Sequence, residues 1–176
     1  DLNGIGCEVM LKTFEDIRML DFCTPVIFAS NKTISFQKNA LNLEINYHGI
    51  QEANMALEGK INVVNVWKEI PEISFGNSTK EAGKYAIQSL RAAVIALKNN
   101  EVDVLVTAPI NKDNVQSDDF KFPGHTDYLA AELEGESLMF MVTENLKVGL
   151  LTDHVAIKDV VPAISPRLIR NKISII

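Results

Sequence analysis

Residues 80–106 read KEAGKYAIQSLRAAVIALKNNEVDVLV, and this stretch decides the fold class. Over residues 80–98 apolar side chains recur at intervals of three and four, which is typical of a long amphipathic helix. An Asn-Asn pair then ends the helix. Residues 102–106 are almost entirely apolar, as expected of a strand that helices cover on both faces. The stretch therefore predicts an α/β fold with a mainly parallel sheet.

Three further strand patterns precede this helix. Residues 25–29 are short and rich in β-branched side chains, residues 43–47 alternate between apolar and polar, and residues 61–67 are again apolar. Ser78 or Thr79 offers the hydroxyl that would cap the helix that follows. The order of strands and helices is that of an α/β domain.

The segment after the expected strand at residues 102–106 is where we look first for chemistry. In open parallel sheets ligands bind outside the carboxyl ends of the strands. The residues at that point are 107–112, TAPINK, which end on a lysine. Lys112 could bind a phosphate or carboxylate as a point charge, although most loop lysines are simply solvated.

Residues 120–124 form a plausible link into a second unit. We expect a first α/β domain over residues 1–120 and the start of a second, incomplete one over residues 121–176. The patterns in the second part predict one helix and two strands joined by a tight turn, at residues 127–133, 138–143 and 147–151.

Composition excludes several classes of protein. The 176 residues carry 17 basic and 23 acidic side chains, so the net charge of −6 argues against a nucleic-acid-binding surface. No apolar run approaches the roughly 20 residues that span a bilayer, and the first residues lack the pattern of a signal peptide, so we expect none. Two cysteines, Cys7 and Cys23, are too few for a disulfide framework. We expect a cytoplasmic protein with reduced thiols and no membrane or nucleic-acid partner.

The two ends of the chain and the missing motifs refine this picture. The chain begins without Met in a glycine-bearing turn and stops within an amphipathic helix, so we expect a fragment. Its glycine pair at residues 4 and 6 lacks the third glycine of a dinucleotide fingerprint. No P-loop, nucleophile-elbow or zincin motif occurs, which argues against those three chemistries.

Three histidines are candidates for chemistry. His48 fits a solvated turn residue. His125 opens a helix, where free N–H groups suit an anion, but a capped helix with an exposed histidine fits equally well. His154 follows an apolar strand, a common position for a metal ligand, yet one histidine cannot hold a metal that needs three or four ligands.

Four segments in order resemble one family. Residues 1–8 (DLNGIGCE) resemble G-D-P-A-G-I-G-P-E, and residues 107–112 match T-A-P-I-N-K. Residues 122–127 (FPGHTD) match a G-H-T-E segment with Asp in place of Glu. Residues 152–160 (TDHVAIKDV) resemble T-x-H-x-P-L-x-x-V/I, with Ala156 where proline is usual. The chain thus resembles the 4-hydroxythreonine-4-phosphate dehydrogenase family of pyridoxal phosphate (vitamin B6) biosynthesis.

The resemblance implies a fold and a set of site residues. The fold is the two-domain α/β architecture of the isocitrate and isopropylmalate dehydrogenases, present here as an N-terminal fragment of a homodimeric enzyme. His125 and Thr126 inherit substrate contacts, and His154 inherits one ligand position of a divalent cation (Zn, Mg, Mn or Co). The other metal ligands are expected downstream of residue 176. Lys112 is the candidate catalytic residue, and the residue that accepts the hydroxyl proton is not identified.

The resemblance also implies a reaction. NAD or NADP would oxidise 4-phosphooxy-threonine, a small phosphorylated hydroxy amino acid, to a β-keto acid that decarboxylates to 3-amino-2-oxopropyl phosphate. Departures from the family pattern leave two alternatives open. The substrate could be another phosphorylated hydroxy acid, such as a four-carbon sugar-acid phosphate, or the chain could be a non-catalytic fragment. A metal-dependent hydrolase would need a tighter His/Asp cluster than this sequence offers.

Overall fold

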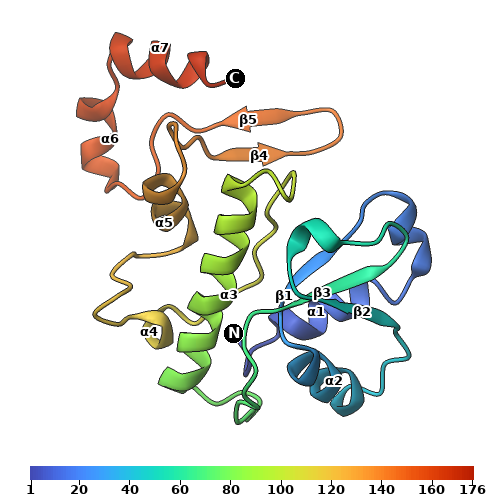
Figure 1. Ribbon diagram of the computed structural model, residues 1–176. Helices are drawn as coiled ribbons and strands as arrows, with labels where there is room; N and C mark the ends of the chain where they lie inside the picture. Colours follow the sequence, from blue (N-terminus) through green and yellow to red (C-terminus); the bar gives the residue numbers. More distant parts are fainter. The chain divides into compact units, whose positions relative to one another are not determined.

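The computed structural model describes residues 1–176, which divide into two compact units, Asp1–Tyr128 and Leu129–Ile176 (Figure 1). This boundary lies downstream of the expected one at residues 120 and 121. The assignment of residues 1–120 and 121–176 to two domains of an enzyme stays a prediction.

A parallel three-stranded sheet forms the centre of the first unit. Its strands are β1 (Val26–Ala29), β2 (Tyr47–Ile50) and β3 (Ile61–Asn65), in the order β1-β3-β2. In register, Val26 lies opposite Asn62 and Tyr47 opposite Ile61. The predicted parallel sheet is confirmed, and its central strand β3 is the most buried.

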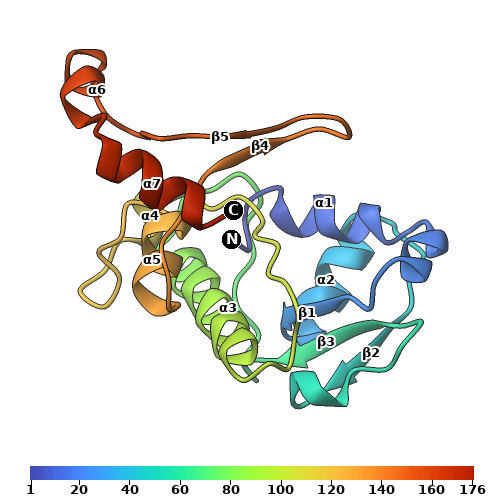
Figure 2. The ribbon, with the colours of Figure 1, turned by 90° about the horizontal axis from the view of Figure 1, so that it is seen from above.

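Helices cover both faces of this sheet. The helices that begin in the first unit are α1 (Gly6–Thr13), α2 (Asn31–Ala40), α3 (Lys80–Lys98), α4 (Lys112–Val115) and α5 (His125–Glu132), with short 3-10 turns η1 (Ile17–Asp21) and η2 (Ala53–Met55). Seen from above, α1 and α2 lie together beside the sheet (Figure 2). Ile61 and Val63 of β3 pack into the cluster that contains residues of α1 and α2, whereas Val64 packs with Ala96 of α3. The side chains of alternate β3 residues therefore point to opposite faces of the sheet.

The long helix α3 agrees with its predicted bounds, Lys80–Lys98. Thr79, one of the two expected caps, accepts a hydrogen bond from Ala82 N at 3.2 Å. Asn99 ends the helix, and Asn100 follows in the left-handed region with φ +57°. Both ends of α3 could be predicted from the sequence, because each depends only on the residues next to the helix.

The predicted strand at residues 43–47 is displaced. Leu43 and Ile45 are buried as expected, but the ladder to β3 begins only at Tyr47. The backbone before that point is bonded elsewhere, because Leu43 N donates to Lys38 O and Lys38 Nζ donates to Ile45 O. The alternating pattern therefore predicted the buried positions correctly, but it predicted the wrong residues for the pairing with β3.

The predicted strand at residues 102–106 is wrong for this chain. No strand is hydrogen-bonded to this segment, and Val104 and Val106 are 75% and 88% exposed. An apolar run indicates a segment that favours burial. A strand also needs a neighbour for its N–H and C=O groups, and residues 1–176 supply none here.

The second unit contains an antiparallel hairpin and two helices. Strands β4 (Phe140–Val142) and β5 (Lys147–Gly149) pair, and Thr143 N donates to Leu146 O at 2.8 Å in the turn. Helices α6 (Ile157–Ala163) and α7 (Pro166–Ser174) follow, and Ser165 caps α7. Both predicted strands are confirmed, each shorter than expected. No helix in either unit is sufficiently long and apolar to cross a membrane.

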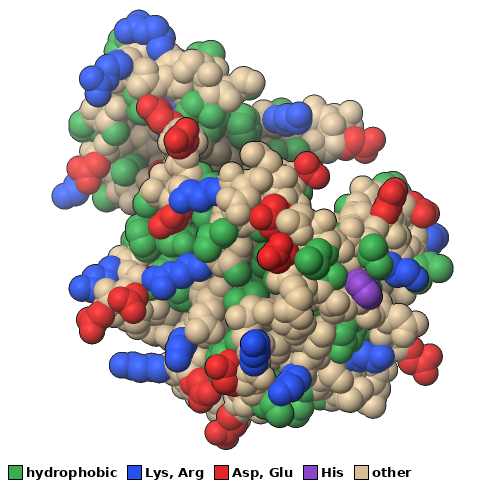
Figure 3. Space-filling model, in the orientation of Figure 1, with side chains coloured by type: hydrophobic (Ala, Val, Ile, Leu, Met, Phe, Trp, Pro, Cys, Tyr) green, Lys and Arg blue, Asp and Glu red, His purple; other side chains and the backbone are tan.

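Charged side chains are distributed over the surface of both units. Figure 3 shows lysine and arginine side chains scattered among acidic ones on the face in view, with apolar areas between them. This distribution follows from the mixed composition and the modest net charge of −6.

Candidate functional site

Segments that lie far apart in the sequence meet in the first unit. A Cβ placed on Gly6, at the start of α1, would come within 2.8 Å of Ala108 Cβ. Only glycine permits this approach, so the N-terminal loop and the 107–112 loop are in contact. Two of the four motif segments are thereby brought together.

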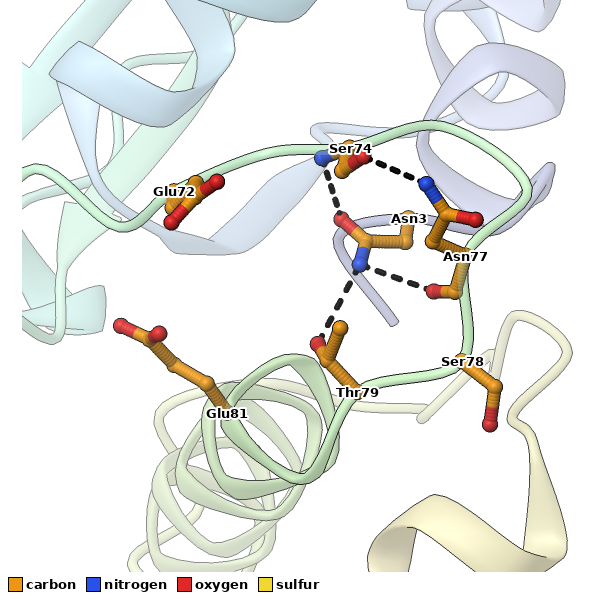
Figure 4. Close-up of a pocket in the computed structure, with 7 residues that line it drawn as sticks. All are labelled: Asn3, Glu72, Ser74, Asn77, Ser78, Thr79 and Glu81. Atoms are coloured by element: carbon orange, nitrogen blue, oxygen red, sulfur yellow. Dashed lines mark hydrogen bonds between the residues drawn. The ribbon is translucent and has the colours of Figure 1, made fainter.

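Asn3 holds the N-terminal loop in place (Figure 4). Its side chain accepts a hydrogen bond from Ser74 N at 2.9 Å and donates to Asn77 O at 2.9 Å and Thr79 Oγ1 at 3.3 Å. The residue is only 4% exposed. Thr79 is also the cap of α3, so Asn3 joins the loop directly to the start of that helix.

Two open pockets flank this loop. One, of about 360 Å³, is drawn in Figure 4 and is lined by Asn3, Glu72, Ser74, Asn77, Ser78, Thr79 and Glu81. The other, of about 350 Å³, lies between the N-terminal loop and the 109–111 backbone and includes Asn114. The first is lined by amide, hydroxyl and carboxylate groups that can hydrogen-bond a polar ligand, whereas the second also has apolar side chains in its lining, those of Ile5, Pro109 and Ile110.

The short helix α4 fixes the end of the 107–112 loop. Asn111 caps it by accepting hydrogen bonds from Asp113 N and Asn114 N. The backbone of Asn114 lies directly against Gly83 of α3, where a Cβ would meet Asn114 O at 2.0 Å. Ser78 Oγ also donates to Asn114 Oδ1. Lys112, the first residue of α4, is thus carried on an anchored element.

The segment between α4 and α5 is anchored as well. Gln116 Nε2 donates to Phe122 O at 2.9 Å, and Arg91 donates to Asp119 O at 2.6 Å. Phe120 is fully buried, and its ring packs against those of Phe122 and Tyr128 at centroid distances of 5.4 and 5.2 Å. The aromatic cluster therefore holds the backbone that leads into His125.

His125 is the first residue of α5 and is half-buried. Burial lowers the pKa of its imidazole, and the positive charge of Lys112 lowers it further. Since the unperturbed pKa is about 6.5, the ring is neutral at pH 7. A neutral imidazole can accept one hydrogen bond and donate another.

Lys112 lies beside the glycine that precedes His125. Its Cε is 3.8 Å from the position that a Cβ on Gly124 would occupy. The side chain is exposed, and its ammonium group makes no hydrogen bond or ion pair within the chain. Thr126 is exposed on the first turn of α5. Three of the four motif segments therefore meet in one region of the first unit.

The other two histidines lie elsewhere. His48 is exposed as expected, but it belongs to β2, opposite Asn62, and not to a turn. His154 is in the second unit, exposed, in a loop with φ +52°. Strand β5 ends at Gly149, so the expectation that His154 directly follows a strand is wrong. The expected apolar run continues to Leu151, but the paired backbone stops earlier.

The residues of this chain do not assemble a metal site on their own. No group of three or more His, Cys, Asp or Glu side chains could hold a metal ion. His154 supplies one imidazole, whereas a protein metal site needs three or four ligands. Any metal bound through His154 would take its remaining ligands from outside residues 1–176.

Sequence reasoning missed two residues that shape the site. Asn3 replaces the alanine of the family pattern, and this departure was the only signal of its role. Gly83 looks like an ordinary helix residue in the sequence, yet α4 could not approach α3 with a larger residue there.

Both cysteines are free, and burial raises the pKa of Cys7 to about 11.

Comparison with known proteins identifies relatives of this chain. The 4-hydroxythreonine-4-phosphate dehydrogenase of Bacteroides thetaiotaomicron is 37% identical over 99% of the chain and 49% of its own length. The enzyme of that name from Sulfurihydrogenibium sp. is 32% identical over the whole chain and 54% of its own length. The chain therefore spans about half the length of these relatives.

Solved structures agree with the sequence relatives. The crystal structure of a 4-hydroxythreonine-4-phosphate dehydrogenase from Burkholderia phymatum superposes with a TM-score of 0.88 at 27% identity, over 99% of this chain and 54% of that one. The sequence profile of the family described as "Pyridoxal phosphate biosynthetic protein PdxA" matches residues 21–176. On these matches the chain belongs to the PdxA family of pyridoxal phosphate biosynthetic proteins.

Proposed function

We propose that this chain forms part of an NAD- or NADP-dependent dehydrogenase that oxidises 4-phosphooxy-threonine. The product is a β-keto acid that decarboxylates to 3-amino-2-oxopropyl phosphate. The hydroxyl carbon loses a hydride to the nicotinamide and the hydroxyl loses a proton, and carbon dioxide then leaves from the keto acid. Membership of the PdxA family supports this proposal.

One structural observation carries the proposal. The N-terminal loop contacts the 107–112 loop through Gly6, and Lys112 lies against Gly124, next to His125. Three of the four motif segments thus share one region of the first unit. A site assembled from several loops on a rigid scaffold is the usual arrangement of an enzyme.

The decisive experiment is a substrate panel with the full-length enzyme. Formation of reduced nicotinamide is measured with 4-phosphooxy-threonine and with four-carbon sugar-acid phosphates, with each cofactor and with Zn, Mg, Mn or Co added. We expect turnover with 4-phosphooxy-threonine and detection of the decarboxylated amine by mass spectrometry. Turnover confined to a sugar-acid phosphate would move the proposal to that substrate. Absence of any turnover would remove it.

We assign substrate contact to His125 and Thr126. Both lie on the first turn of α5, where backbone N–H groups have no partner within the helix. We expect His125→Ala in the full-length enzyme to raise the substrate KM strongly and to leave metal content intact. Loss of metal at unchanged KM would contradict this assignment.

We assign one ligand position for a divalent cation to His154. The experiment is His154→Ala in the full-length enzyme, with metal content measured by mass spectrometry beside steady-state kinetics. We expect loss of bound metal and a fall in kcat of at least ~100-fold, because metal stabilisation of charge is worth several kcal/mol. Full metal occupancy and normal turnover would remove His154 from the site.

The remaining parts of the proposal concern the whole protein. We propose a two-domain fold like that of isocitrate and isopropylmalate dehydrogenases, a homodimer and a cytoplasmic location. Because the chain spans about half of its relatives, we expect the polypeptide 1–176 to show no dehydrogenase activity by itself. Metal-dependent turnover by that polypeptide would show that the catalytic residues lie within it.

A further inference from the structure

We propose that the pocket between the N-terminal loop and residues 109–111 binds the nicotinamide ring of the cofactor, and that the side-chain amide of Asn114 donates a hydrogen bond to the carboxamide oxygen of that ring. This inference rests on the proposed function, because it assumes an NAD- or NADP-dependent enzyme. It names a cofactor-binding residue, which neither the sequence motifs nor the family resemblance identified. It follows from one buried amide whose N–H groups have no partner.

The first argument is that Asn114 holds an unused hydrogen-bond donor. The residue is 8% exposed, and its Oδ1 accepts a hydrogen bond from Ser78 Oγ, whereas its Nδ2 has no partner. Three other buried side-chain atoms lack a partner, but all three are oxygens, and their residues line neither of the two pockets described above. Buried polar groups in folded proteins are almost always paired. The free donor of Asn114 therefore indicates a ligand that accepts a hydrogen bond in this pocket.

The second argument is that this amide is carried on an anchored backbone. The backbone of Asn114 lies directly against Gly83 of α3, and Asn114 N donates to Asn111 Oδ1 at 3.2 Å. At the N-terminal loop, Gly76 N donates to Asn3 O at 2.9 Å, and both of these residues line the same pocket. Groups that are already fixed lose little conformational freedom when a ligand binds. The pocket is therefore largely formed before a ligand enters it.

The third argument concerns the charge of the pocket. No lysine, arginine or histidine lines it, and the carboxylate of Asp1 is the single charged side chain in its lining. A phosphate or carboxylate would lose its hydration there without a cation to pair with, which is unfavourable. Lys112 lies against Gly124 instead. The oxidised nicotinamide ring carries a positive charge, which a nearby carboxylate favours.

The fourth argument is the apolar part of the same lining. Ile5, Pro109 and Ile110 contribute apolar side chains to the pocket that contains Asn114. Ile5 is 60% exposed, so the chain itself leaves this apolar surface uncovered. A planar ring gains free energy when its faces pack on apolar side chains, and a few polar groups then fix its orientation. Nicotinamide combines such a ring with a carboxamide, whereas the substrate has no ring. The adenine ring of the cofactor is the competing occupant.

The first experiment measures cofactor binding to the full-length enzyme by titration calorimetry in the absence of substrate. The oxidised cofactor is compared with its acetylpyridine analogue, which keeps the carbonyl oxygen, and with its pyridine analogue, which lacks the carboxamide. We expect the acetylpyridine analogue to bind about as tightly as the cofactor, and the pyridine analogue to bind about three- to tenfold more weakly. Equal affinity of all three dinucleotides would overturn the proposal. This comparison uses the wild-type protein and does not depend on the folding of any variant.

The second experiment repeats these titrations with Asn114→Asp and with a matched control, Asn39→Asp. Aspartate at residue 114 keeps an oxygen for Ser78 and replaces the donor by a second oxygen. Asn39 is exposed on α2, lies outside the pocket and undergoes the same change in charge. We expect Asn114→Asp to bind the cofactor and its pyridine analogue equally, while the control keeps the wild-type ratio of affinities. The ratio is informative because both rings carry the same positive charge. A wild-type ratio in Asn114→Asp, or the same change in the control, would overturn the proposal.

A third measurement separates nicotinamide from adenine and from water. The side-chain amide signal of Asn114 in the NMR spectrum is assigned by its absence from Asn114→Asp. We expect nicotinamide mononucleotide to shift this signal and AMP to leave it in place. A shift with AMP alone would assign the pocket to adenine, and no shift with either would leave an ordered water as the partner of Asn114. Both results would overturn the proposal.

The failure of this inference is distinguishable from the failure of the proposed function. If neither NAD nor NADP binds and no substrate turns over, the proposed function fails and this inference fails with it. If the cofactor binds and turns over but the pyridine analogue binds equally well, the assignment of Asn114 fails and the proposed function stands.

Discussion

The central strand of the parallel sheet, β3, and strand β4 of the hairpin are both rich in apolar residues, yet β3 is buried and β4 is exposed. Ile61, Asn62, Val63 and Val64 of β3 are all buried, whereas every residue of β4 and β5 is exposed. Helices cover both faces of the first sheet, and nothing in the second unit covers the hairpin in the same way. An apolar strand therefore contributes to stability in proportion to the layers that pack on it.

The largest expected effect contrasts two phenylalanines. Phe120 is fully buried in the aromatic cluster, and Phe140 on β4 is 37% exposed. We expect Phe120→Ala to lower the free energy of unfolding by about 3–5 kcal/mol, the usual cost of a large core deletion. Phe140→Ala should cost less than half of that. Chemical denaturation followed by circular dichroism measures both, and equal losses would break the contrast between the units.

A pair of glycines gives the next contrast. In Gly83→Ala the new Cβ would meet Asn114 O at 2.0 Å, and backbone atoms of α4 would have to move. Overpacking of this kind costs about 1–3 kcal/mol. In Gly149→Ala on β5 the nearest atom is Phe140 Cε1 at 3.3 Å, in a side chain that can turn away. We expect the second variant to unfold at nearly the wild-type denaturant concentration, and a loss equal to that of Gly83→Ala would contradict the comparison.

The pH dependence of unfolding gives a further prediction for the first unit, which contains Cys7. Burial raises the pKa of Cys7 from 9.0 to about 11. The folded state thus holds the neutral thiol more tightly than the unfolded state does. Its contribution to stability is complete below pH 9 and is lost as pH rises toward about 11. We expect Cys7→Ala to flatten the stability profile between these values.

The smallest expected effect lies on the hairpin surface. Met141 and Val142 are each 61% exposed. We expect Met141→Thr to change the free energy of unfolding by no more than about 0.5 kcal/mol, as for most surface substitutions. Analytical ultracentrifugation of the same variant reports whether this face also takes part in association. A destabilisation as large as that of Phe120→Ala would show that the hairpin is a second core.

The sequence correctly predicted the structural features that depend only on neighbouring residues, and it failed for features that depend on distant parts of the chain. Helix α3 was predicted with Ser78 or Thr79 as its cap and with its end at Asn99, because the apolar period, the cap and the stop all lie in or next to the helix; the structure has Thr79 as the cap. The strand at residues 102–106 was predicted wrongly because pairing depends on a partner elsewhere. The parallel sheet followed from the order of elements, although the residues paired in β2 did not.

The same distinction holds for the site. The sequence predicted chemistry at the 107–112 loop, from an expected strand end where the structure has no strand, and at His125, from a helix start that the structure has. Both roles stay predictions. The sequence could not reveal that Lys112 lies over Gly124, because that contact depends on how α4 is anchored to Gly83. Nor could it reveal the hydrogen bonds of Asn3, which join the chain start to residues 74–79.

Asn3 also has a consequence for the chemical ageing of the protein. It precedes Gly4, and an asparagine followed by glycine deamidates readily when its side chain can reach the next backbone nitrogen. In the folded chain the Asn3 amide is held by Ser74, Asn77 and Thr79, so the reaction is suppressed. Once the chain unfolds, conversion to aspartate would place a carboxylate against Asn77 O and prevent the loop from closing again. We expect heat-treated samples to lose refolding yield in proportion to deamidation at Asn3, measured by peptide mass spectrometry, so that each unfolding event becomes progressively irreversible.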